Sequence, residues 1–263
     1  MGMTFDRIRT ERFVDTPNLP SSKVTVVIAA DLVPEIIIAL RSRGIRVITP
    51  QADADLPEPV NRHGDLQCIH LQGKSWLVVR SEIELQQRLK DEGAEVLPTE
   101  QRLGNEYPAD IRLNALIHNK QMFGKLKELD PALQKACSFA GIHTVSVRQG
   151  YTNCSAAILS EKAMITADTG IAQAAEQHGI EVLKIRAGNI RLPGYEYGFI
   201  GGCCGLISES VVAFTGALKF HPDGLQMRRF IEAQKKQVLE LTQNPLIDIG
   251  GILPVKEEDR WSN

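Results

Sequence analysis

GYTNCSAAILSEKAMITA, residues 150–167, and GFIGGCCG, residues 198–205, are the two stretches that decide the fold of this chain. The first opens with a polar group around Asn153 and Cys154 and continues as two short apolar strands that turn at Glu161–Lys162. The second stretch begins the same order again. A repeated unit is therefore the first feature to look for.

The residues between these stretches complete one unit. Asp168–Gln177 predicts a helix, because Asp168 is a good N-cap residue and Gly179 supplies the left-handed position that ends a helix. Ile180–Ile185 then predicts a strand. The unit is thus strand, strand, helix, glycine, strand.

The N-terminal side contains one incomplete unit and two complete ones. The first unit starts directly with a buried strand at Lys23–Ala29, followed by a helix at Val33–Arg43 and a strand at Ile45–Thr49, so it lacks a leading strand. Lys125–Leu129, in the third unit, stays open between a turn and a short helix. The elements expected in the second and third units are His63–Leu71, Ser75–Val79, a helix from Ser81 to Glu92, Ala94–Leu97, Ala109–Ile117, Gln121–Gly124, a helix from Asp130 to Ala140, and Ile142–Val147.

The C-terminal side contains one unit and a surplus strand. Pro245–Val255 is a polar-headed strand with no unit after it, and it matches the leading strand that the first unit lacks. We expect it to pair beside Lys23–Ala29 and close the units into a ring, because closure removes exposed sheet edges. The elements expected in the fifth unit are Val211–Thr215, a helix from Pro222 to Lys236, and Val238–Leu241.

Polar residues at the heads of the leading strands recur with a period near 45. Successive heads are 45, 44, 49 and 45 residues apart. This regularity favours one α/β domain over residues 23–255, with 1–22 as an N-terminal arm and 256–263 as a C-terminal tail; an open α/β sheet with chance spacing is the alternative. The five heads are Asp65, Asp110, Cys154, Cys203 and Asp248.

The composition is that of an ordinary globular protein, with 263 residues, 43% hydrophobic, 24% charged and a net charge of −2. A net charge of this sign and size does not favour binding to nucleic acid or to an anionic membrane. No apolar run is long enough to cross a bilayer. No hydrophobic signal region opens the chain, and the five cysteines form no CxxC pair, so we expect a cytoplasmic protein with reduced thiols. Cys68 and His70 share a strand face but have no third partner, which predicts no metal site.

The ring resembles the pentein fold, the α/β-propeller of a superfamily that contains guanidino-group-modifying enzymes and a ribosome anti-association factor. The resemblance covers residues 23–255 and is carried by the repeat order and by segments such as GYTNCSAAILSEKAMITAD and GFIGGCCGLISESVVAFTG. These segments are similar to an uncharacterised bacterial branch of the superfamily. The fold implied is a pentein-like five-fold α/β-propeller of ββαβ units, closed by the C-terminal strand.

The resemblance implies that the leading strands line a central channel in which their polar heads converge. A small cationic guanidino or amidino ligand needs such a set: carboxylates pair with the planar cation, a thiolate attacks the central carbon, and an imidazole shuttles protons. No metal or organic cofactor is required. The candidates are Cys154 as nucleophile, His63 as acid/base, and Asp65, Asp110, Asn153, Asp248 and Cys203 as substrate-binding residues.

The segment His63-Gly64-Asp65 matches the H-x-D segment of the family. Cys154 lies two units after it, as the family's nucleophile does, and Asp248 takes the acidic position one unit before it once the ring closes. In the family's enzymes the cysteine lies near the C-terminus, so this correspondence needs a circular shift of the units.

Two kinds of function follow from the resemblance. The first is a hydrolase or amidinotransferase that acts on a small guanidino or amidino compound through a cysteine nucleophile. The alternative is a non-catalytic binding module, either a ribosome-associated factor or a small-ligand sensor, because the cysteine position is permuted and no second histidine is among the heads. Two points stay open: whether Cys154 or Cys203 faces the channel, and whether Tyr151, Tyr195 and Tyr197 line a pocket or pack in the core. The oligomeric state stays open as well.

Overall fold

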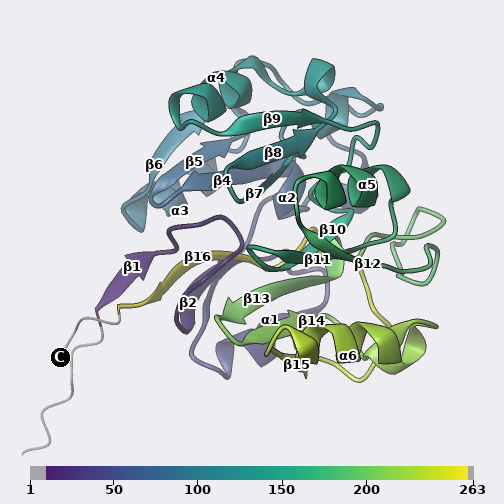
Figure 1. The fold of residues 1–263 in the computed structure, drawn as a ribbon. Coiled ribbons are helices and arrows are strands. Elements are labelled where there is room, and N and C mark those ends of the chain that lie inside the picture. The colour runs from purple at the N-terminus through teal and green to yellow at the C-terminus, as the bar shows by residue number, and fades with distance from the viewer. Residues whose placement is uncertain (1–9, 260–263) are drawn as a thin grey trace, which may run out of the picture.

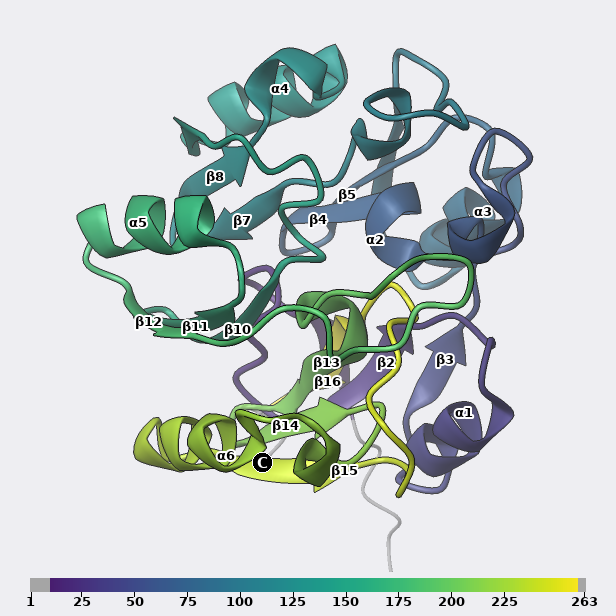
Figure 2. The ribbon, with the colours of Figure 1, turned by 90° about the vertical axis from the view of Figure 1, so that its right-hand side faces the viewer.

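A computed structural model of the chain describes residues 10–259. The strands form five small sheets, one with four strands and four with three. In Figures 1 and 2 these sheets surround a common centre, with α1, α3, α4, α5 and α6 on the outside and the short α2 further in. The expected five-fold α/β ring is confirmed.

Each of the four units after the first contains an antiparallel strand pair followed by a strand parallel to the second of the pair. In the fourth unit, for example, Ala157 lies opposite Ile165, and Ile165 lies beside Leu183 on the strand that returns from helix α5. The strands are β1 (Glu11–Phe13), β2 (Val24–Ile28), β3 (Arg46–Ile48), β4 (Cys68–Gln72), β5 (Ser75–Val78), β6 (Glu95–Pro98), β7 (Leu116–His118), β8 (Gln121–Gly124), β9 (His143–Ser146), β10 (Ala156–Ser160), β11 (Ala163–Thr166), β12 (Glu181–Lys184), β13 (Cys204–Ser208), β14 (Val211–Phe214), β15 (Gln237–Glu240) and β16 (Leu253–Glu258).

Local capping signals set the ends of the outer helices. The Asp130 and Asp168 carboxylates each accept a backbone N–H of their own first helical turn, which satisfies a donor that a helix leaves unpaired. A glycine with positive φ follows α1, α3, α4 and α5, as Gly179 does at +77°. The helices are α1 (Pro34–Arg41), α2 (Gly64–Gln67), α3 (Ile83–Asp91), α4 (Pro131–Phe139), α5 (Thr169–Gln177) and α6 (Gly224–Ala233), with 3₁₀ turns η1 (Glu58–Val60), η2 (Ala109–Ile111), η3 (Leu126–Glu128), η4 (Gly201–Cys203) and η5 (Leu218–Phe220).

The C-terminal strand closes the ring as expected, because β16 pairs antiparallel with β2 in the place of the missing leading strand. The expected boundaries of the arm and the tail need correction. β1 pairs with the outer edge of β16, so Glu11–Phe13 belongs to the sheet, and β16 itself runs on to Glu258. The backbone N–H and C=O groups on the outer edge of β16 form hydrogen bonds with β1. Both ends of the described chain therefore belong to the ring. Residues 1–9 of the arm and 260–263 of the tail lie outside the described residues.

The polar heads lie in tight turns before the leading strands, not within them. The strands expected at His63–Leu71 and Ala109–Ile117 begin only at Cys68 and Leu116, and α2 and η2 precede them. Among residues 10–259, the ladder between β4 and β5 begins only at Cys68. The residues before it pair their backbone groups in a helical turn, as the Gln67 N–H does with the His63 carbonyl. Apolar alternation does not separate such a turn from a strand. The segment left open in the third unit contains the short helix η3.

The apolar core is divided among the five junctions between neighbouring sheets. Val26 and Ile28 of β2, for example, pack with Trp76 and Leu85 of the next unit, and four similar clusters fill the other junctions. Each unit therefore buries its apolar faces against both neighbours, as a closed ring requires. Among residues 10–259 no helix is long and apolar enough to cross a membrane.

Candidate active site

The turn that carries His63 and Asp65 is held in place by the closing segment of the ring. The Asp65 backbone N–H donates to the Gly250 carbonyl at 3.3 Å. Gly250 has φ +75°, and a Cβ atom there would lie 2.6 Å from the His63 Cα. Only glycine combines this backbone conformation with so close an approach. The surplus C-terminal strand thus brings residue 250 against the H-x-D turn.

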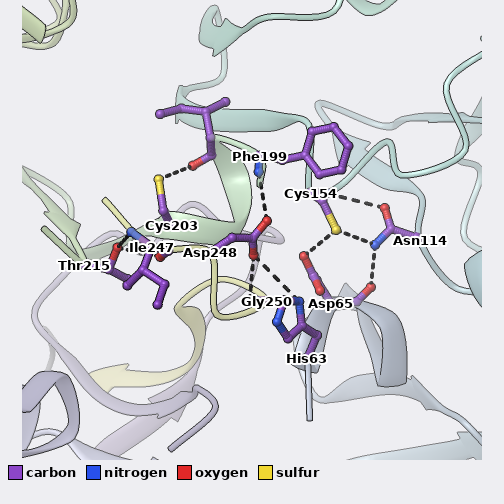
Figure 3. A network of polar contacts seen from close by, with 11 residues as sticks. His63, Asp65, Asn114, Cys154, Phe199, Cys203, Thr215, Ile247, Asp248 and Gly250 are labelled. Atoms are coloured by element: carbon purple, nitrogen blue, oxygen red, sulfur yellow. Dashed lines mark hydrogen bonds and ion pairs between the residues drawn. The ribbon is translucent and has the colours of Figure 1, made fainter. Parts of the chain in front are cut away.

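The Cys154 thiol lies at the end of a buried polar network (Figure 3). Its Sγ atom lies 2.7 Å from Asp65 Oδ2 and 3.0 Å from the Asn114 side-chain nitrogen. Cys154 is 3% exposed and Asp65 is 1% exposed. The thiol donates to the carboxylate, while the Asn114 amide donates to the sulfur.

Asn114 is a residue of the site that the sequence analysis did not single out. Its Oδ1 atom accepts the backbone N–H of Asn153 at 2.9 Å, and its Nδ2 atom also donates to the Asp65 carbonyl at 2.9 Å. These bonds fix the orientation of the amide, so the N–H toward Cys154 is held in place. The available signal was an asparagine in the apolar run LNALI directly before β7.

His63 and Asp248 form the second half of the network. The His63 Nδ1 atom lies 3.7 Å from Asp248 Oδ1, and the carboxylate also accepts the backbone N–H groups of Phe199 at 2.8 Å and Gly250 at 3.0 Å. Both side chains are buried, at 2% and 1% exposure. The His63 Nε2 atom has no hydrogen-bond partner among the described residues.

Burial shifts the titration of these groups. Burial, and after it the negative charge of Asp248, raise the pKa of Asp65 to about 7. Burial also raises the pKa of the Cys154 thiol, with the two carboxylates adding to the effect, and it lowers the pKa of His63. These shifts favour a neutral thiol and a neutral imidazole at neutral pH.

The two carboxylates have no cationic side chain beside them. Within residues 10–259, neither Asp65 nor Asp248 forms an ion pair with a lysine or arginine. Asp65 Oδ1 has no hydrogen-bond partner in the same part of the chain. Since two buried carboxylates without a counter-charge are costly, this arrangement favours a cationic ligand.

A cavity of about 210 Å³ opens onto this network. Its floor holds Cys154, His63 and Asp248, and Asp65 lies behind the thiol, against a smaller cavity of about 30 Å³. The remaining lining is mostly aromatic and aliphatic: Val60, Leu66, Tyr151, Leu192, Tyr195, Glu196, Tyr197 and Phe199. The three tyrosines thus line a pocket, which answers the point left open by the sequence.

Asp110 and Asn153 lie near the cavity but do not line it. The Asp110 carboxylate accepts the Tyr151 hydroxyl and is not among the residues that line the cavity. Asn153 lies in the turn before Cys154, with its backbone N–H on Asn114, and it lines the small cavity behind Asp65. Their direct contact with a ligand stays a prediction.

Cys203 is not brought to the cavity. It is fully buried in the core cluster between the fourth and fifth sheets, and its thiol donates to the Ile200 carbonyl at 3.2 Å. The neighbouring Cys204 makes the same contact, and both thiols are free. Of the two cysteines that the sequence left open, the one at the cavity is Cys154.

The Cys68–His70 pair has local partners of its own. His70 stacks on Trp76 with ring centroids 4.5 Å apart, and its Nε2 atom pairs with the Gly73 carbonyl. Over residues 10–259, no group of three or more histidine, cysteine and acidic side chains is arranged to hold a metal ion.

Gly202→Ala is expected to disturb the site through Asp248. A Cβ atom at residue 202 would lie 2.0 Å from Asp248 Oδ1, so the carboxylate must move and lose its backbone hydrogen bonds. We expect a loss of about 2–4 kcal/mol in the free energy of unfolding, measured by urea denaturation. Gly170→Ala, in the exposed first turn of α5, is the matched control and is expected to change stability by less than about 1 kcal/mol. Equal stability of the two variants would contradict the close packing around Asp248.

Comparison with known proteins places the chain in a family and in a fold. Residues 27–253 match a family of unknown function, DUF6873. No curated protein matches the sequence. The solved structures it resembles include the SxtG amidinotransferase of the saxitoxin pathway from Microseira wollei, with a TM-score of 0.54, 11% identity, and coverage of 88% of this chain and 91% of that one.

Two further structures have the same fold. DDAH from Pseudomonas aeruginosa, a cysteine-to-serine mutant in complex with citrulline, has a TM-score of 0.53 and 9% identity, covering 87% of this chain and 93% of that one. A cysteine-to-serine variant of the agmatine deiminase of C. jejuni with bound substrate has a TM-score of 0.55 and 9% identity, covering 97% and 98%. All three are members of the pentein superfamily, and at these identities the likeness shows the fold.

Proposed function

The chain belongs to the DUF6873 family and has the pentein fold, and from this premise we propose that it modifies a small guanidino or amidino compound through Cys154. The observation that carries the proposal is the pair of buried carboxylates, Asp65 and Asp248, beside a thiol and an imidazole. Within residues 10–259 these carboxylates pair with no lysine or arginine. The structural neighbours are guanidino-modifying enzymes, which supports the same kind of activity.

A bound guanidinium would change the protonation of the site. An opposite charge within about 4–6 Å lowers the pKa of a carboxyl or thiol group. A cation in contact with Sγ is close to Asp65 Oδ2, which lies 2.7 Å from the sulfur. Asp65 Oδ2 already accepts the hydrogen bond of the thiol, so it is placed to accept the thiol proton. The ligand thus helps to activate the nucleophile that attacks it.

The chemical step follows from this arrangement. The Cys154 thiolate attacks the central carbon of the guanidinium, and a C–S bond forms. The C–N bond to the leaving amine breaks as that nitrogen takes up the proton that Asp65 accepted from the thiol, and His63 acts in the second half of the cycle. Asp248 orients the imidazole and stabilises its charged form.

A second nucleophile completes the cycle. Water, in a hydrolase, or another amine, in an amidinotransferase, attacks the same carbon and gives up a proton to His63. The C–S bond breaks and Cys154 regains its proton. The Asn114 N–H, 3.0 Å from the sulfur, stabilises the thiolate each time it forms.

The test is covalent labelling with 2-chloroacetamidine, an electrophilic amidinium, followed by peptide mapping. We expect fast, saturable modification of Cys154, slowed by guanidino compounds. The other four cysteines are buried and do not line the 210 Å³ cavity, so they serve as internal controls. Slow labelling with no preference among the cysteines would overturn the proposal.

A non-catalytic ligand sensor is the second candidate, and one observation favours it. Burial raises the pKa of the Cys154 thiol, which favours its neutral form. A sensor would bind guanidino compounds at the two carboxylates without activating this thiol. Tight binding together with slow labelling would support the sensor and reject the enzyme.

A further inference from the structure

The wall and mouth of the cavity are acidic and aromatic. Tyr195, Glu196 and Tyr197 follow one another at the mouth, and each is exposed to solvent. Below them lie Cys154, His63 and Asp248. No lysine or arginine is among the residues that line the cavity in the described part of the chain.

The mouth is built on a defined turn. The Tyr195 N–H donates to the Leu192 carbonyl at 3.0 Å, and Gly194 has φ +88°. With Pro193 before the glycine, this is the residue order of a type II turn. A Cβ atom at residue 194 would lie 2.5 Å from the Pro59 side chain, so the turn packs closely on the neighbouring unit. Tyr195 and Glu196 are therefore positioned by packed backbone.

An aromatic wall connects the mouth to the floor. The Tyr151 ring stacks with Phe199 at a centroid distance of 5.8 Å, and Tyr197 meets Phe199 edge to face at 6.3 Å. Ring faces of this kind attract cations. Since substrates in this cavity would pass along these faces, the wall favours a cationic group over an anionic one.

A buried carboxylate backs this wall. Asp110 is 2% exposed, accepts the Tyr151 hydroxyl, and leaves its Oδ1 atom without a hydrogen-bond partner among the described residues. Its negative charge also raises the pKa of Tyr195, after the larger effect of burial. Asp110, Glu196 and Asp248 thus give the cavity a negative potential from the floor to the mouth.

We propose that Glu196, with Tyr195 and Tyr197, makes the cavity selective for guanidino compounds that carry a second cationic group and no carboxylate. This inference rests on the proposed function, because it assumes that the guanidinium end binds at the floor. A distal ammonium group contacts the Glu196 carboxylate and the tyrosine faces at the mouth. A distal carboxylate meets only like charge there, which costs binding free energy.

Three ligands that differ by one group test the selectivity. Agmatine has a distal amine, arginine has the same amine beside a carboxylate, and butylguanidine has no distal charge. Their dissociation constants are measured by calorimetry on Cys154→Ser protein, which keeps a hydroxyl donor for Asp65 and prevents turnover. We expect agmatine to bind at least about 10-fold tighter than butylguanidine and about 100-fold tighter than arginine.

Glu196→Gln should then weaken agmatine about 10-fold, leave butylguanidine unchanged, and reduce the discrimination against arginine. Glu176→Gln, an exposed position on α5 away from the cavity, is the matched control and should change none of the three. The salt dependence of the agmatine affinity should fall in Glu196→Gln, which a purely structural role would not produce.

The outcomes separate the two proposals. Equal affinity for all three ligands, or an unchanged order in Glu196→Gln, would overturn the selectivity while leaving guanidinium binding at the floor intact. If none of the three binds and none protects Cys154 of the wild-type protein from 2-chloroacetamidine, the proposed function fails and the selectivity fails with it.

Discussion

Replacing Cys154 by serine is expected to reduce turnover to background, a loss of at least ~10³-fold, while leaving ligand affinity within about 3-fold of wild type. The hydroxyl keeps a donor for Asp65 Oδ2, which accepts from the thiol in the wild-type protein. It is a far weaker nucleophile than a thiolate in the same place. Binding therefore survives and the chemical step does not.

The measurement uses the guanidino compound that best protects Cys154 from 2-chloroacetamidine. Product is followed as released ammonia or amine, and affinity is followed by calorimetry. Cys203→Ala is the matched control, because Cys203 is equally buried but lies in the core away from the cavity. Turnover that survives in Cys154→Ser, or that disappears in Cys203→Ala, would assign the chemistry to a different residue.

Asp65→Asn is expected to make the protein more stable at pH 8 and unable to hold a guanidinium. Folding raises the pKa of Asp65 from 3.8 to about 7, so the folded state binds this proton more tightly than the unfolded state does. The stabilising effect is complete below pH 3.8 and is lost as the pH rises through about 7. This difference in pKa corresponds to about 4 kcal/mol at most.

The amide removes this pH dependence, because it does not ionise. Urea denaturation at a series of pH values should therefore show that the free energy of unfolding of the wild type falls relative to that of Asp65→Asn between pH 4 and pH 7. At pH 8 the variant should be more stable by about 1–4 kcal/mol. Asp15→Asn, at an exposed position, is the control and should follow the wild type at every pH.

The same variant should lose guanidinium affinity by about 100-fold, because the amide has no charge to pair with the cation. If Asp65→Asn gains stability and loses affinity for the ligand, then Asp65 serves ligand binding at a cost to the stability of the fold. Lower stability at pH 8, together with unchanged affinity, would remove Asp65 from the site.

The repeat order of the chain was readable because each outer element carries its own local signal. Asp130 and Asp168 cap helices with their own side chains, and Gly179 ends α5 at positive φ. The surplus strand at the C-terminus predicted ring closure. It needs a free sheet edge to pair with, and the first unit, which lacks a leading strand, offers one. These features depend on neighbours a few residues away, and the structure confirms them.

The turns at the centre of the ring were not readable in the same way. The sequence around His63 and Asp65 alternates like a strand, but it forms α2, and the strand ladder of that unit begins only after it. Asp110, the head expected in the third unit, accepts the Tyr151 hydroxyl, and Asn114 contacts the thiol instead. Asp110 and Asn114 are only four residues apart, which is a small difference in a repeat of about 45 residues. It nevertheless decides which of the two side chains reaches the Cys154 thiol.

The resemblance to the pentein fold made Cys154, His63, Asp65 and Asp248 the candidates for its chemistry. The sequence pattern alone predicted the five-unit ring and its closure by the C-terminal strand. Local capping, alternation and spacing carry that information over short distances. Only the tertiary structure decided which polar heads meet, that Cys203 packs in the core, and that three tyrosines and Glu196 line the cavity. The polar contacts of the site join residues that are far apart in the chain, such as Asn114 with Cys154, 40 positions apart, and Asp65 with Cys154, 89 positions apart. The order of residues along the chain does not reveal which of them will meet.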